Sequence, residues 1–379
     1  MTVIRQIENA CLEELASSRK IMLIYGPRQA GKTTLVKQLG KLSGLKAKYI
    51  SADLSVNELL LMQRDLKTLS DFTEGYQLLI IDEAQRIQDI GLVLKIIYDE
   101  MPHLKVIATG SSSFDLANQT AEPLTGRKTV FQLLPFALGE ISPGINKFEL
   151  DQQLGEILLY GMYPEVYTAP VGQKRRLLGE ICESYLFKDV LQLTVVKYTL
   201  KIRDLLRLLA FQVGQLVSVN ELSQKLSINR ETVERYIDLL EKSFVIFRLP
   251  AYSRNLRKEV AKMDKIYFYD TGILNYLIDN FKSIDYRNDT GNLWENFVVA
   301  ERRKQLLCLR KNTRSYFWRT YTGAEIDYVE EDEDGLMGFE IKMTKNNVKS
   351  PRLWNDEYQG GFQLVNRKNY LDLLLEGMV

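Results

Sequence analysis

The chain has 379 residues, of which 45% are hydrophobic and 26% are charged, and its formal net charge is +1. This length predicts two to four domains, and the hydrophobic content is sufficient for packed cores. A net charge so close to zero excludes a global electrostatic attraction to nucleic acid or membranes, so any such affinity must come from local patches.

Histidine and cysteine are too sparse for several common kinds of site. The single histidine, His103, excludes a histidine-based triad or a histidine metal cluster. The cysteines Cys11, Cys182 and Cys308 lie far apart, which indicates a reducing compartment rather than a zinc ribbon or a disulfide framework. No apolar stretch approaches the roughly 20 residues that span a bilayer, and the charged N-terminal segment predicts an amphipathic helix rather than a signal peptide. We therefore expect a cytoplasmic protein without a membrane partner.

A glycine-rich loop follows the first predicted strand, residues 21–25, and precedes a predicted helix. The loop fits the pattern G-x-x-x-x-G-K-[ST], in which the glycines permit close approach of the backbone to phosphate and the amide groups face the anion. Lys32 is predicted to reach the β- and γ-phosphates, and Thr33 to hold Mg²⁺. The alternative, an ordinary glycine-rich turn, is disfavoured by the flanking strand and helix. The predicted nucleotide-binding residues are Gly26, Pro27, Arg28, Gln29, Ala30, Gly31, Lys32, Thr33 and Thr34.

Two acidic residues end a later predicted strand. After a strand at 47–51, residues 78–81 are four consecutive apolar residues, which suits a strand buried on both faces of a parallel sheet. At its carboxyl end, Asp82 is predicted to bind Mg²⁺ through water, and Glu83 to activate the attacking water as a general base. The alternative is a solvated acidic turn.

The next two predicted strands, residues 104–112 and 128–134, add polar candidates. Thr109, Ser111 and Ser112 are candidates for a residue that senses the γ-phosphate, and we assign Ser111 to the catalytic group. Arg127 is a candidate for stabilising transition-state charge, within its own subunit or across an interface. An ordinary surface arginine is an equally good interpretation, and Arg86 is a weaker candidate.

The segments GPRQAGKTT, LLIIDEAQRI, VIATGSSS and LTGR occur in this order within the first 140 residues. Together they resemble the bacterial and archaeal AAA-like P-loop ATPases, and more closely the subgroup whose C-terminal half carries a domain of uncharacterised function. The resemblance implies a core sheet over residues 1–140 with a glutamate-assisted hydrolytic site. It also implies Mg-ATP as the ligand and formation of homo-oligomers.

The middle of the chain predicts a helical lid or connector at 141–210 and a winged helix at 211–284. Ser218 and Glu221 suit a capping box at the start of a helix, and a second helix over 231–240 precedes predicted strands at 244–249 and 265–269. Glu231 and Glu234 weaken the DNA-binding interpretation, so DNA contact and protein docking stay open. The residues that could meet phosphates are Arg230, Thr232, Arg235, Arg254, Arg257, Lys258 and Lys262.

The last segment, 285–379, places Glu295 on a predicted helix, Asp327 on a predicted strand, and Glu340 and Lys342 on one face of the next strand. Over about residues 290–370 this constellation resembles the PD-(D/E)xK nuclease fold, although Ile326 stands where that motif has proline. The resemblance implies that Asp327 and Glu340 bind Mg²⁺, that Glu295 supports them, and that Lys342 orients or activates water. A salt-bridged sheet without activity is the alternative.

A basic cluster in the same segment is either a site for a phosphate backbone or a solvated helix face. It consists of Arg302, Arg303, Lys304, Arg310, Lys311 and Arg314.

The predicted fold is therefore α/β, with a parallel P-loop sheet followed by a helical lid, a winged helix and a small nuclease-like domain. We expect ATP hydrolysis coupled to the binding or processing of nucleic acid, with DNA as the expected partner. The first alternative is a regulatory nucleotide switch whose C-terminal domain has no catalytic activity, and the second is a small-molecule kinase.

Overall fold

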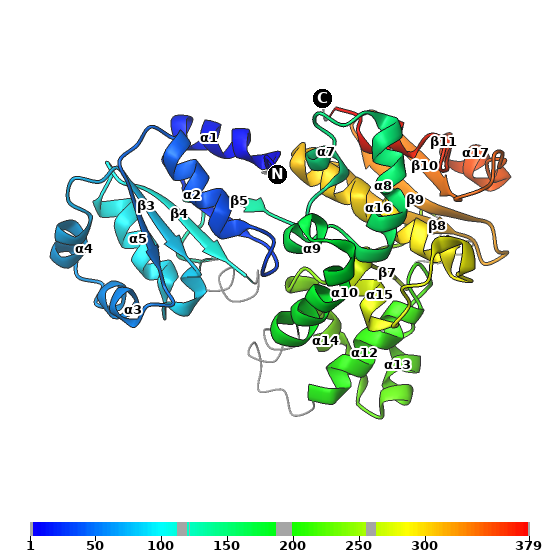
Figure 1. Cartoon of the computed structure of the whole chain (residues 1–379), viewed down its shortest axis with the longest axis horizontal. Coiled ribbons are helices and arrows are strands. Elements are labelled where there is room, and N and C mark those ends of the chain that lie inside the picture. The colour runs from blue at the N-terminus through cyan, green and yellow to red at the C-terminus, as the bar shows by residue number, and fades with distance from the viewer. Residues whose placement is uncertain (1–2, 112–119, 121, 187–198, 255–262, 378–379) are drawn as a thin grey trace. The chain divides into compact units, whose positions relative to one another are not determined.

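The computed structural model describes residues 3–111, 120, 122–186, 199–254 and 263–377 (Figure 1). The chain divides into two compact units, Met1–Pro135 with Lys242–Phe244, and Phe136–Glu241 with Val245–Val379. Nearly all of the predicted ATPase core lies in the first unit. Most residues of the other three predicted segments lie in the second unit.

The first unit is built on a five-stranded parallel sheet with the strand order β2-β3-β4-β1-β5. Every residue of β1 and β3 is buried, as their unbroken apolar sequences predict. The predicted α/β class with a parallel P-loop sheet is thus confirmed. The strands are β1 (Ile21–Tyr25), β2 (Ala47–Ser51), β3 (Leu78–Asp82), β4 (Lys105–Gly110) and β5 (Lys128–Gln132).

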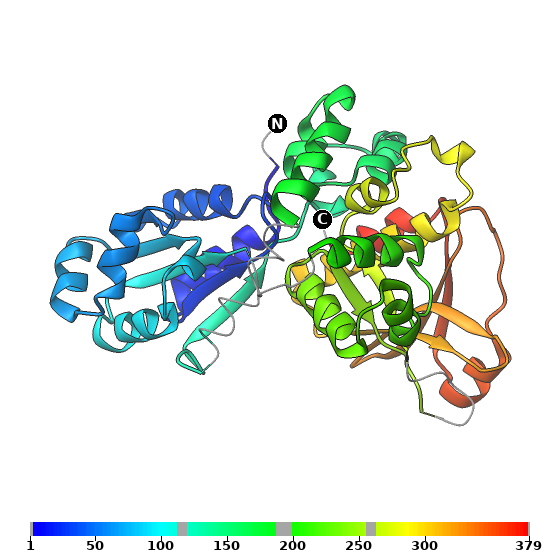
Figure 2. The ribbon, with the colours of Figure 1, turned by 90° about the horizontal axis from the view of Figure 1, so that it is seen from below.

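Helices cover both faces of this sheet (Figures 1 and 2). α1 (Ile7–Ser17) and α2 (Lys32–Leu42) pack together, whereas α3 (Ser55–Met62) and α4 (Leu66–Thr73) pack on α5 (Ile90–Glu100). The strand order reverses direction at β1, between β4 and β5. Ligands of open α/β sheets bind at the carboxyl ends of the strands beside such a reversal, which is where the glycine-rich loop leaves β1.

The second unit begins with a mostly helical region. Its helices are α7 (Leu138–Ile141), α8 (Lys147–Tyr160), α9 (Pro164–Thr168), α10 (Val171–Glu180), the π-helical turn Ile181–Leu186, α12 (Thr199–Phe211), α13 (Val219–Leu226), α14 (Arg230–Lys242) and α15 (Thr271–Leu277). Two short strands, β6 (Ile246–Leu249) and β7 (Lys265–Phe268), pair in antiparallel register. Ser218 caps α13 as predicted, because its Oγ accepts a hydrogen bond from Glu221 N over 3.3 Å.

A four-stranded sheet completes the second unit, in the order β11-β10-β9-β8. Its strands are β8 (Arg314–Arg319), β9 (Glu325–Asp332), β10 (Gly335–Ile341) and β11 (Gly361–Val365), and only the β10–β11 pair is parallel. The associated helices are α16 (Thr290–Cys308), α17 (Arg352–Tyr358) and α18 (Tyr370–Leu374).

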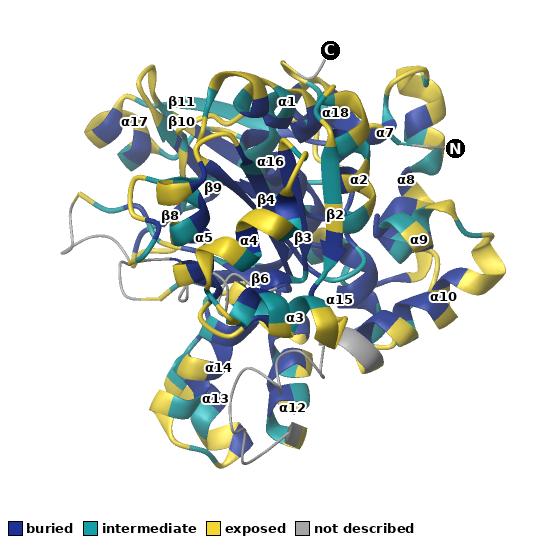
Figure 3. Ribbon diagram, turned by 90° about the vertical axis from the view of Figure 1, so that its left-hand side faces the viewer, coloured by how far each residue is buried: buried dark blue, intermediate teal, exposed yellow. Residues whose placement is uncertain are grey.

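Aromatic side chains form much of the core of this sheet region. Trp294 of α16 packs against Phe297 and Tyr370, while Trp318 and Trp354 belong to a separate buried cluster. Figure 3 shows the central strand β4 as buried, whereas β2 at the edge of the same sheet is largely intermediate in burial. Within the described part of the chain, every helix is too short or too polar to traverse a bilayer.

Candidate functional site

The glycine-rich loop closes around the ammonium group of Lys32. Lys32 is buried and its Nζ donates hydrogen bonds to Gly26 O and Pro27 O, each over 2.9 Å. A Cβ atom on Gly26 would lie 1.9 Å from Leu133 O, so no side chain fits at this position. Gly31 has a φ of +94° directly before α2, in the left-handed region that favours glycine. The glycine-rich loop expected from the sequence is therefore present in the structure.

Three hydroxyl groups hold the buried carboxylate of Asp82 at the carboxyl end of β3. Thr33 Oγ1 donates to Asp82 Oδ2 over 2.7 Å, and Tyr49 Oη donates to the same oxygen over 2.8 Å. Thr109 Oγ1 donates to Asp82 Oδ1. Hydroxyl and carboxylate oxygens are the ligands that Mg²⁺ prefers, so Thr33 and Asp82 together form a donor set that fits this ion.

Tyr49 was not predicted as a site residue. Burial raises the pKa of its hydroxyl, and Asp82 raises it further, so the hydroxyl stays protonated and acts as a donor. In the β2–β3 pairing Ser51 lies opposite Asp82, and Tyr49 lies two residues before Ser51. Its long side chain bridges that offset to reach Asp82. Only the strand register reveals this relationship.

Glu83 occupies a left-handed backbone conformation, with φ 55° and ψ 40°. Its backbone N donates to Thr109 Oγ1 over 3.0 Å, which ties the residue after β3 to the end of β4. A non-glycine residue at positive φ is uncommon and often marks a functional position. The left-handed backbone conformation of Glu83 and its hydrogen bond to Thr109 thus fix the position of this residue at the end of β3.

Gln85 joins two of the predicted catalytic side chains. Its Nε2 donates to Glu83 Oε2 over 2.6 Å and to Ser111 Oγ over 3.0 Å. Ser111 is therefore brought to the same site as Glu83. Gln85 itself was missed as a site residue, although it lies in one of the segments that carry the family resemblance. Ser112, another predicted sensor residue, lies outside the described residues.

Arg127 lies at the end of the sheet opposite to the glycine-rich loop, where β1 begins. Ile21, the first residue of β1, donates its backbone N–H to Arg127 O, whereas the loop follows the last residue, Tyr25. Four steps along a strand span roughly 13 Å. Arg127 Nε instead donates to Asp99 Oδ1 over 3.0 Å. The structure thus does not bring Arg127 to the loop of its own subunit. Arg86 pairs with Asp53 over 3.3 Å.

In the second unit, Lys342 lies between two predicted acidic residues. Its Nζ is 2.6 Å from Asp327 Oδ2 and 3.0 Å from Glu340 Oε1. Ile341 N also donates to Asp327 Oδ2 over 2.8 Å, which fixes this carboxylate against β10. Phe339 and Ile341 are buried, so the polar pair on β10 faces away from the core as predicted.

The fourth predicted residue, Glu295, is held by two residues of β7. Tyr267 Oη donates to Glu295 Oε1 over 2.7 Å, and Lys265 Nζ lies 3.2 Å from the same oxygen. Lys265 Nζ also lies 2.6 Å from Glu325 Oε1 and 3.9 Å from Asp327 Oδ1. We call the six charged residues Lys265, Glu295, Glu325, Asp327, Glu340 and Lys342 the charge cluster.

Lys265 and Tyr267 were missed as site residues. The signal in the sequence is their alternation, because residues two apart on a strand share one face. That signal shows that the two side chains lie together, but not what they face.

Burial and mutual repulsion shift the acids of the charge cluster. Burial raises the pKa of Glu295 to about 7, with Lys265 opposing this shift and Asp327 adding to it. Burial also raises the pKa of Glu340, and the nearby Asp327 contributes. For Lys342, burial disfavours the charged form, but Asp327 and Glu340 outweigh burial and raise its pKa. The cluster therefore keeps its lysines charged while favouring protonation of two acids.

Asp327 and Glu340 are the residues of this cluster that could hold a divalent cation. Mg²⁺ sites often use one or two carboxylates and complete the coordination with water and substrate phosphates. Among the described residues, no group of three or more acidic, histidine or cysteine side chains is placed to hold a metal ion. The two carboxylates converge instead on the ammonium group of Lys342. Their chemistry fits Mg²⁺, provided that Lys342 moves aside.

The structure corrects the interpretation of the basic cluster at 302–314. Arg302 is buried and forms a bidentate ion pair with Glu330. Its Nε donates to Glu330 Oε1 over 2.7 Å and its Nη2 to Glu330 Oε2 over 2.8 Å. Lys304 is also buried and pairs with Glu301 over 2.7 Å. These two side chains are internal because α16 is enclosed by neighbouring elements, so neither belongs to a phosphate site or a solvated face, whereas Arg310, Lys311 and Arg314 of the predicted cluster are exposed.

Three of the predicted phosphate contacts of the middle segment have protein partners. Arg230 pairs with Glu234 over 3.0 Å, and the Arg235 guanidinium lies 5.7 Å from the ring centre of Tyr236. The Arg254 guanidinium packs against the rings of Tyr252 and Tyr358. Three further candidates, Arg257, Lys258 and Lys262, lie outside the described residues.

Comparisons with known families and structures agree with this architecture. A family model described as AAA domain matches residues 18–142. Two models described as domains of unknown function, DUF8612 and DUF4143, match residues 151–283 and 290–361. The solved structure of the Walker-type ATPase PABY2304 of Pyrococcus abyssi matches with a TM-score of 0.50 and 18% identity, over 73% of this chain and 96% of that chain. At this identity the match shows a shared fold.

Two relatives match most of the chain. The uncharacterized protein Rv2008c of Mycobacterium tuberculosis is 30% identical over 349 residues, which cover 91% of this chain and 75% of the relative. An uncharacterized protein of Haemophilus influenzae is 25% identical over 387 residues, which cover 94% of this chain and 92% of the relative. The chain therefore belongs to the family that includes Rv2008c, and its first unit is an AAA-type P-loop ATPase domain.

Proposed function

We propose that the chain is a Mg²⁺-dependent ATPase whose second unit binds and processes nucleic acid. The observation that carries the second part is the convergence of four residues that the sequence separates by up to 47 positions. Glu295, Asp327, Glu340 and Lys342 are linked in one charge cluster by contacts of 2.6–3.9 Å. Lys265 joins Glu295 to Asp327, and Lys342 joins Asp327 to Glu340. The ATPase part is supported by the geometry of the glycine-rich loop and Asp82.

The side chains of the first unit have separable tasks in ATP hydrolysis. Lys32 exchanges its two carbonyl partners, Gly26 O and Pro27 O, for phosphate oxygens. Glu83 accepts the proton of the attacking water, and the hydrogen bond from Gln85 orients its carboxylate. Thr33 and Asp82 would hold Mg²⁺, which neutralises charge on the phosphates when it is bound. Ser111, which accepts a hydrogen bond from Gln85, links this site to the end of β4.

In the second unit, the charge cluster supplies the groups that hydrolysis of a phosphodiester requires. Asp327 and Glu340 would hold Mg²⁺, which provides Lewis-acid assistance when it is bound. Lys342 would then orient the attacking water, and Glu295 would support Asp327. Lys265 limits the repulsion among the acids, because its ammonium group contacts Glu295 and Glu325.

The elements before the cluster support contact with DNA. The order α13, turn, α14, then the antiparallel pair β6 and β7 is the order of a winged helix. We therefore interpret residues 211–284 as a winged helix. Its second strand, β7, carries Lys265 and thereby joins this segment to the charge cluster.

A nuclease assay on the full chain tests the proposal. We expect Mg²⁺-dependent cleavage of DNA by the wild type, loss of cleavage in Glu340→Gln and Lys342→Ala, and unchanged ATP turnover in both variants. Glu333→Gln is the matched control, because Glu333 is an exposed acid in the turn between β9 and β10. Absence of cleavage of any DNA or RNA by the wild type, with either Mg²⁺ or Mn²⁺, overturns the processing function.

One observation favours a second function, a nucleotide switch with a non-catalytic second unit. Lys342 pairs with both candidate metal ligands, and Lys265 contacts three carboxylates, so the cluster is satisfied without a metal ion. Titration of Mg²⁺ into an Asp82→Asn variant, in which the candidate metal-binding carboxylate of the first unit is removed, separates the two functions. Binding that Glu340→Gln removes supports the nuclease, whereas absence of binding supports the switch.

A further inference from the structure

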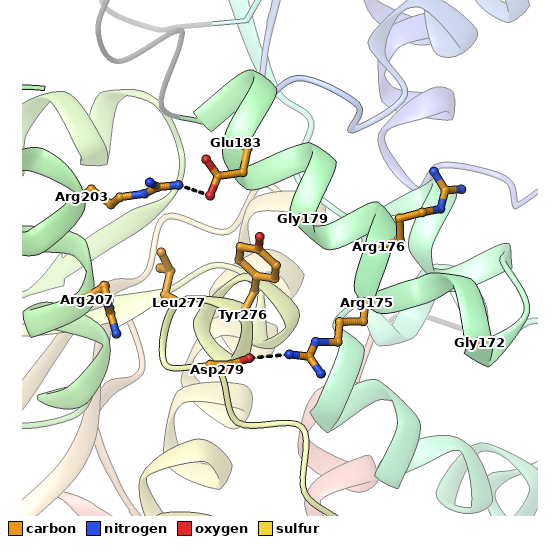
Figure 4. A pocket seen from close by; sticks show the side chains of 10 residues that line it. All are labelled: Gly172, Arg175, Arg176, Gly179, Glu183, Arg203, Arg207, Tyr276, Leu277 and Asp279. Atoms are coloured by element: carbon orange, nitrogen blue, oxygen red, sulfur yellow. Dashed lines mark hydrogen bonds and ion pairs between the residues drawn. The ribbon is translucent and has the colours of Figure 1, made fainter. Parts of the chain in front are cut away.

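Two adjoining hollows in the second unit carry features that the proposed function does not use. The first, which we call the arginine hollow, has a volume of about 750 Å³ and lies between α10, α12 and the end of α15 (Figure 4). The second, which we call the aromatic hollow, has a volume of about 390 Å³. Asp279 lines both, so the two hollows are neighbours. Volumes of this order are typical of ligand sites.

The lining of the arginine hollow carries more cations than acids, although Arg176 also pairs with Glu180 of the same helix. Four arginines line the hollow, Arg175, Arg176, Arg203 and Arg207, against two acids, Glu183 and Asp279. Two of the arginines are held by these acids, Arg175 by Asp279 over 2.7 Å and Arg203 by Glu183 (Figure 4). Exposed ion pairs of this kind contribute little stability, so a phosphate group can replace the carboxylate at small cost. Guanidinium groups bind phosphate through two parallel hydrogen bonds.

Two glycines of α10 line the arginine hollow. Gly172 and Gly179 lie seven residues apart on α10, with Arg175 and Arg176 between them. A Cβ atom on Gly179 would lie 3.1 Å from Tyr276 Oη, so glycine lets this tyrosine approach α10 closely. Figure 4 shows Tyr276 between α10 and the arginines of α12. Gly179 thus permits close packing of Tyr276 against α10 in the wall of the hollow.

The aromatic hollow adds exposed rings. Phe211 is 60% exposed and Tyr286 is 81% exposed, and both line this hollow together with Lys282. Exposed rings beside a basic groove are typical of proteins that bind single-stranded nucleic acid, because unpaired bases stack on the rings while cations hold the backbone.

α12 connects the two hollows. Arg203, Arg207 and Phe211 follow one another at intervals of four residues, which places them along one side of the helix. The opposite side is buried through Ile202, Leu205 and Leu209. Two guanidinium groups and one ring therefore form a continuous row on the outward face of α12.

We propose that this row is a binding track for a single-stranded nucleic acid, with phosphates in the arginine hollow and bases on Phe211 and Tyr286. The inference rests on the proposed nucleic-acid function and adds the location and the kind of strand. One ligand of this kind accounts for both the arginine-rich lining and the exposed rings. A free nucleotide shares the phosphate chemistry but engages only one base at a time.

Fluorescence anisotropy with a labelled single-stranded oligonucleotide tests the track, using full-length chains that carry Lys32→Ala to silence the P-loop. Arg207→Glu should weaken binding and lower the slope of log affinity against log salt by about 0.7. Phe211→Ala should weaken binding at least about fivefold and leave that slope unchanged. Arg352→Glu and Phe148→Ala are the matched controls, because these exposed residues lie outside both hollows.

The outcomes separate this inference from the proposed function. If the chain with intact hollows binds a strand and both track variants bind it as tightly, the location is wrong while the nucleic-acid function stands. If no DNA or RNA oligonucleotide binds at all, the nucleic-acid function fails and the track with it. If labelled ATP binds in the Lys32→Ala chain and Arg207→Glu removes that binding, while no strand binds, the hollow takes free nucleotides and the proposed strand is refuted.

Discussion

Lys265 Nζ lies 3.2 Å from Glu295 Oε1, and this contact joins β7 to α16. The two residues fall in segments that the sequence assigns to different domains, on either side of residue 284. Lys265 is only 2% exposed, and burial of an ammonium group is costly unless carboxylates surround it. Glu325 and Asp327 supply the additional charge. The predicted winged helix and the predicted nuclease-like segment therefore share a buried electrostatic network.

Substitution of Lys265 by methionine should destabilise the second unit strongly. Removal of the cation leaves Glu295 without the ammonium group that contacts it, and breaking a buried ion pair from one side typically costs about 3–5 kcal/mol. Urea unfolding followed by tryptophan fluorescence measures this change in the free energy of unfolding. Lys349→Met is the matched control at an exposed position. Equal unfolding midpoints for the two variants would contradict the structural role of Lys265.

The protonation of Glu295 should make the stability of the second unit depend on pH. Burial raises its pKa from 4.5 to about 7, so between these values the folded chain holds a proton that the unfolded chain has released. Stability from this group is therefore present below about pH 4.5 and is lost as the pH rises through 7.

The measurement for Glu295 is thermal unfolding of the wild type and Glu295→Gln between pH 4.5 and 8. The free energy of unfolding of the wild type should fall relative to the variant by roughly 1–3 kcal/mol across this interval. Glu333→Gln, at an exposed position, should follow the wild type. A constant difference between wild type and Glu295→Gln at every pH would show that Glu295 does not titrate in this range.

Local sequence signals were sufficient for the strands of the first unit. The loop before α2 and the acids after β3 follow from glycine spacing and from an unbroken apolar strand, which involve only neighbouring residues. The paired face of Glu340 and Lys342 follows from the two-residue period of a strand in the same way. These features were predictable because the backbone geometry of one element determines them.

Features that depend on packing between elements were not predictable. The contact of Tyr49 with Asp82 requires the register of two strands, and that of Lys265 with Glu295 requires the packing of β7 on α16. The error over Arg302 has the same origin, because a charged helix residue is ordinarily exposed. Only the position of Glu330 on β9 shows that Arg302 points inward.

Glu83 and Lys32 should separate hydrolysis from binding in the first unit. Glu83→Gln removes the proton acceptor and should reduce ATP turnover by about 10²–10⁴-fold while ATP still binds, because the loop is intact. Lys32→Ala should abolish ATP turnover because it removes the ammonium group that contacts the phosphate oxygens of ATP. Phosphate release and calorimetric titration of ATP measure the two quantities. Glu74→Gln controls for loss of an exposed acid in this unit. Normal turnover in Glu83→Gln would assign the base elsewhere.

Arg127→Ala should leave ATP turnover unchanged when the protein is monomeric. Arg127 precedes β5 at the edge of the sheet away from the loop, and its partner is Asp99. Loss of this partly exposed pair should cost at most about 1 kcal/mol of stability. Asp99→Asn is the matched control, because it removes the same pair and retains the arginine.

Steady-state turnover is measured over a range of protein concentrations that brackets any oligomerisation seen by light scattering. A loss of turnover in Arg127→Ala at every concentration would mean that Arg127 reaches its own loop, which the sheet geometry forbids. A loss confined to the oligomer, and absent in Asp99→Asn, would instead assign Arg127 to the site of a neighbouring subunit.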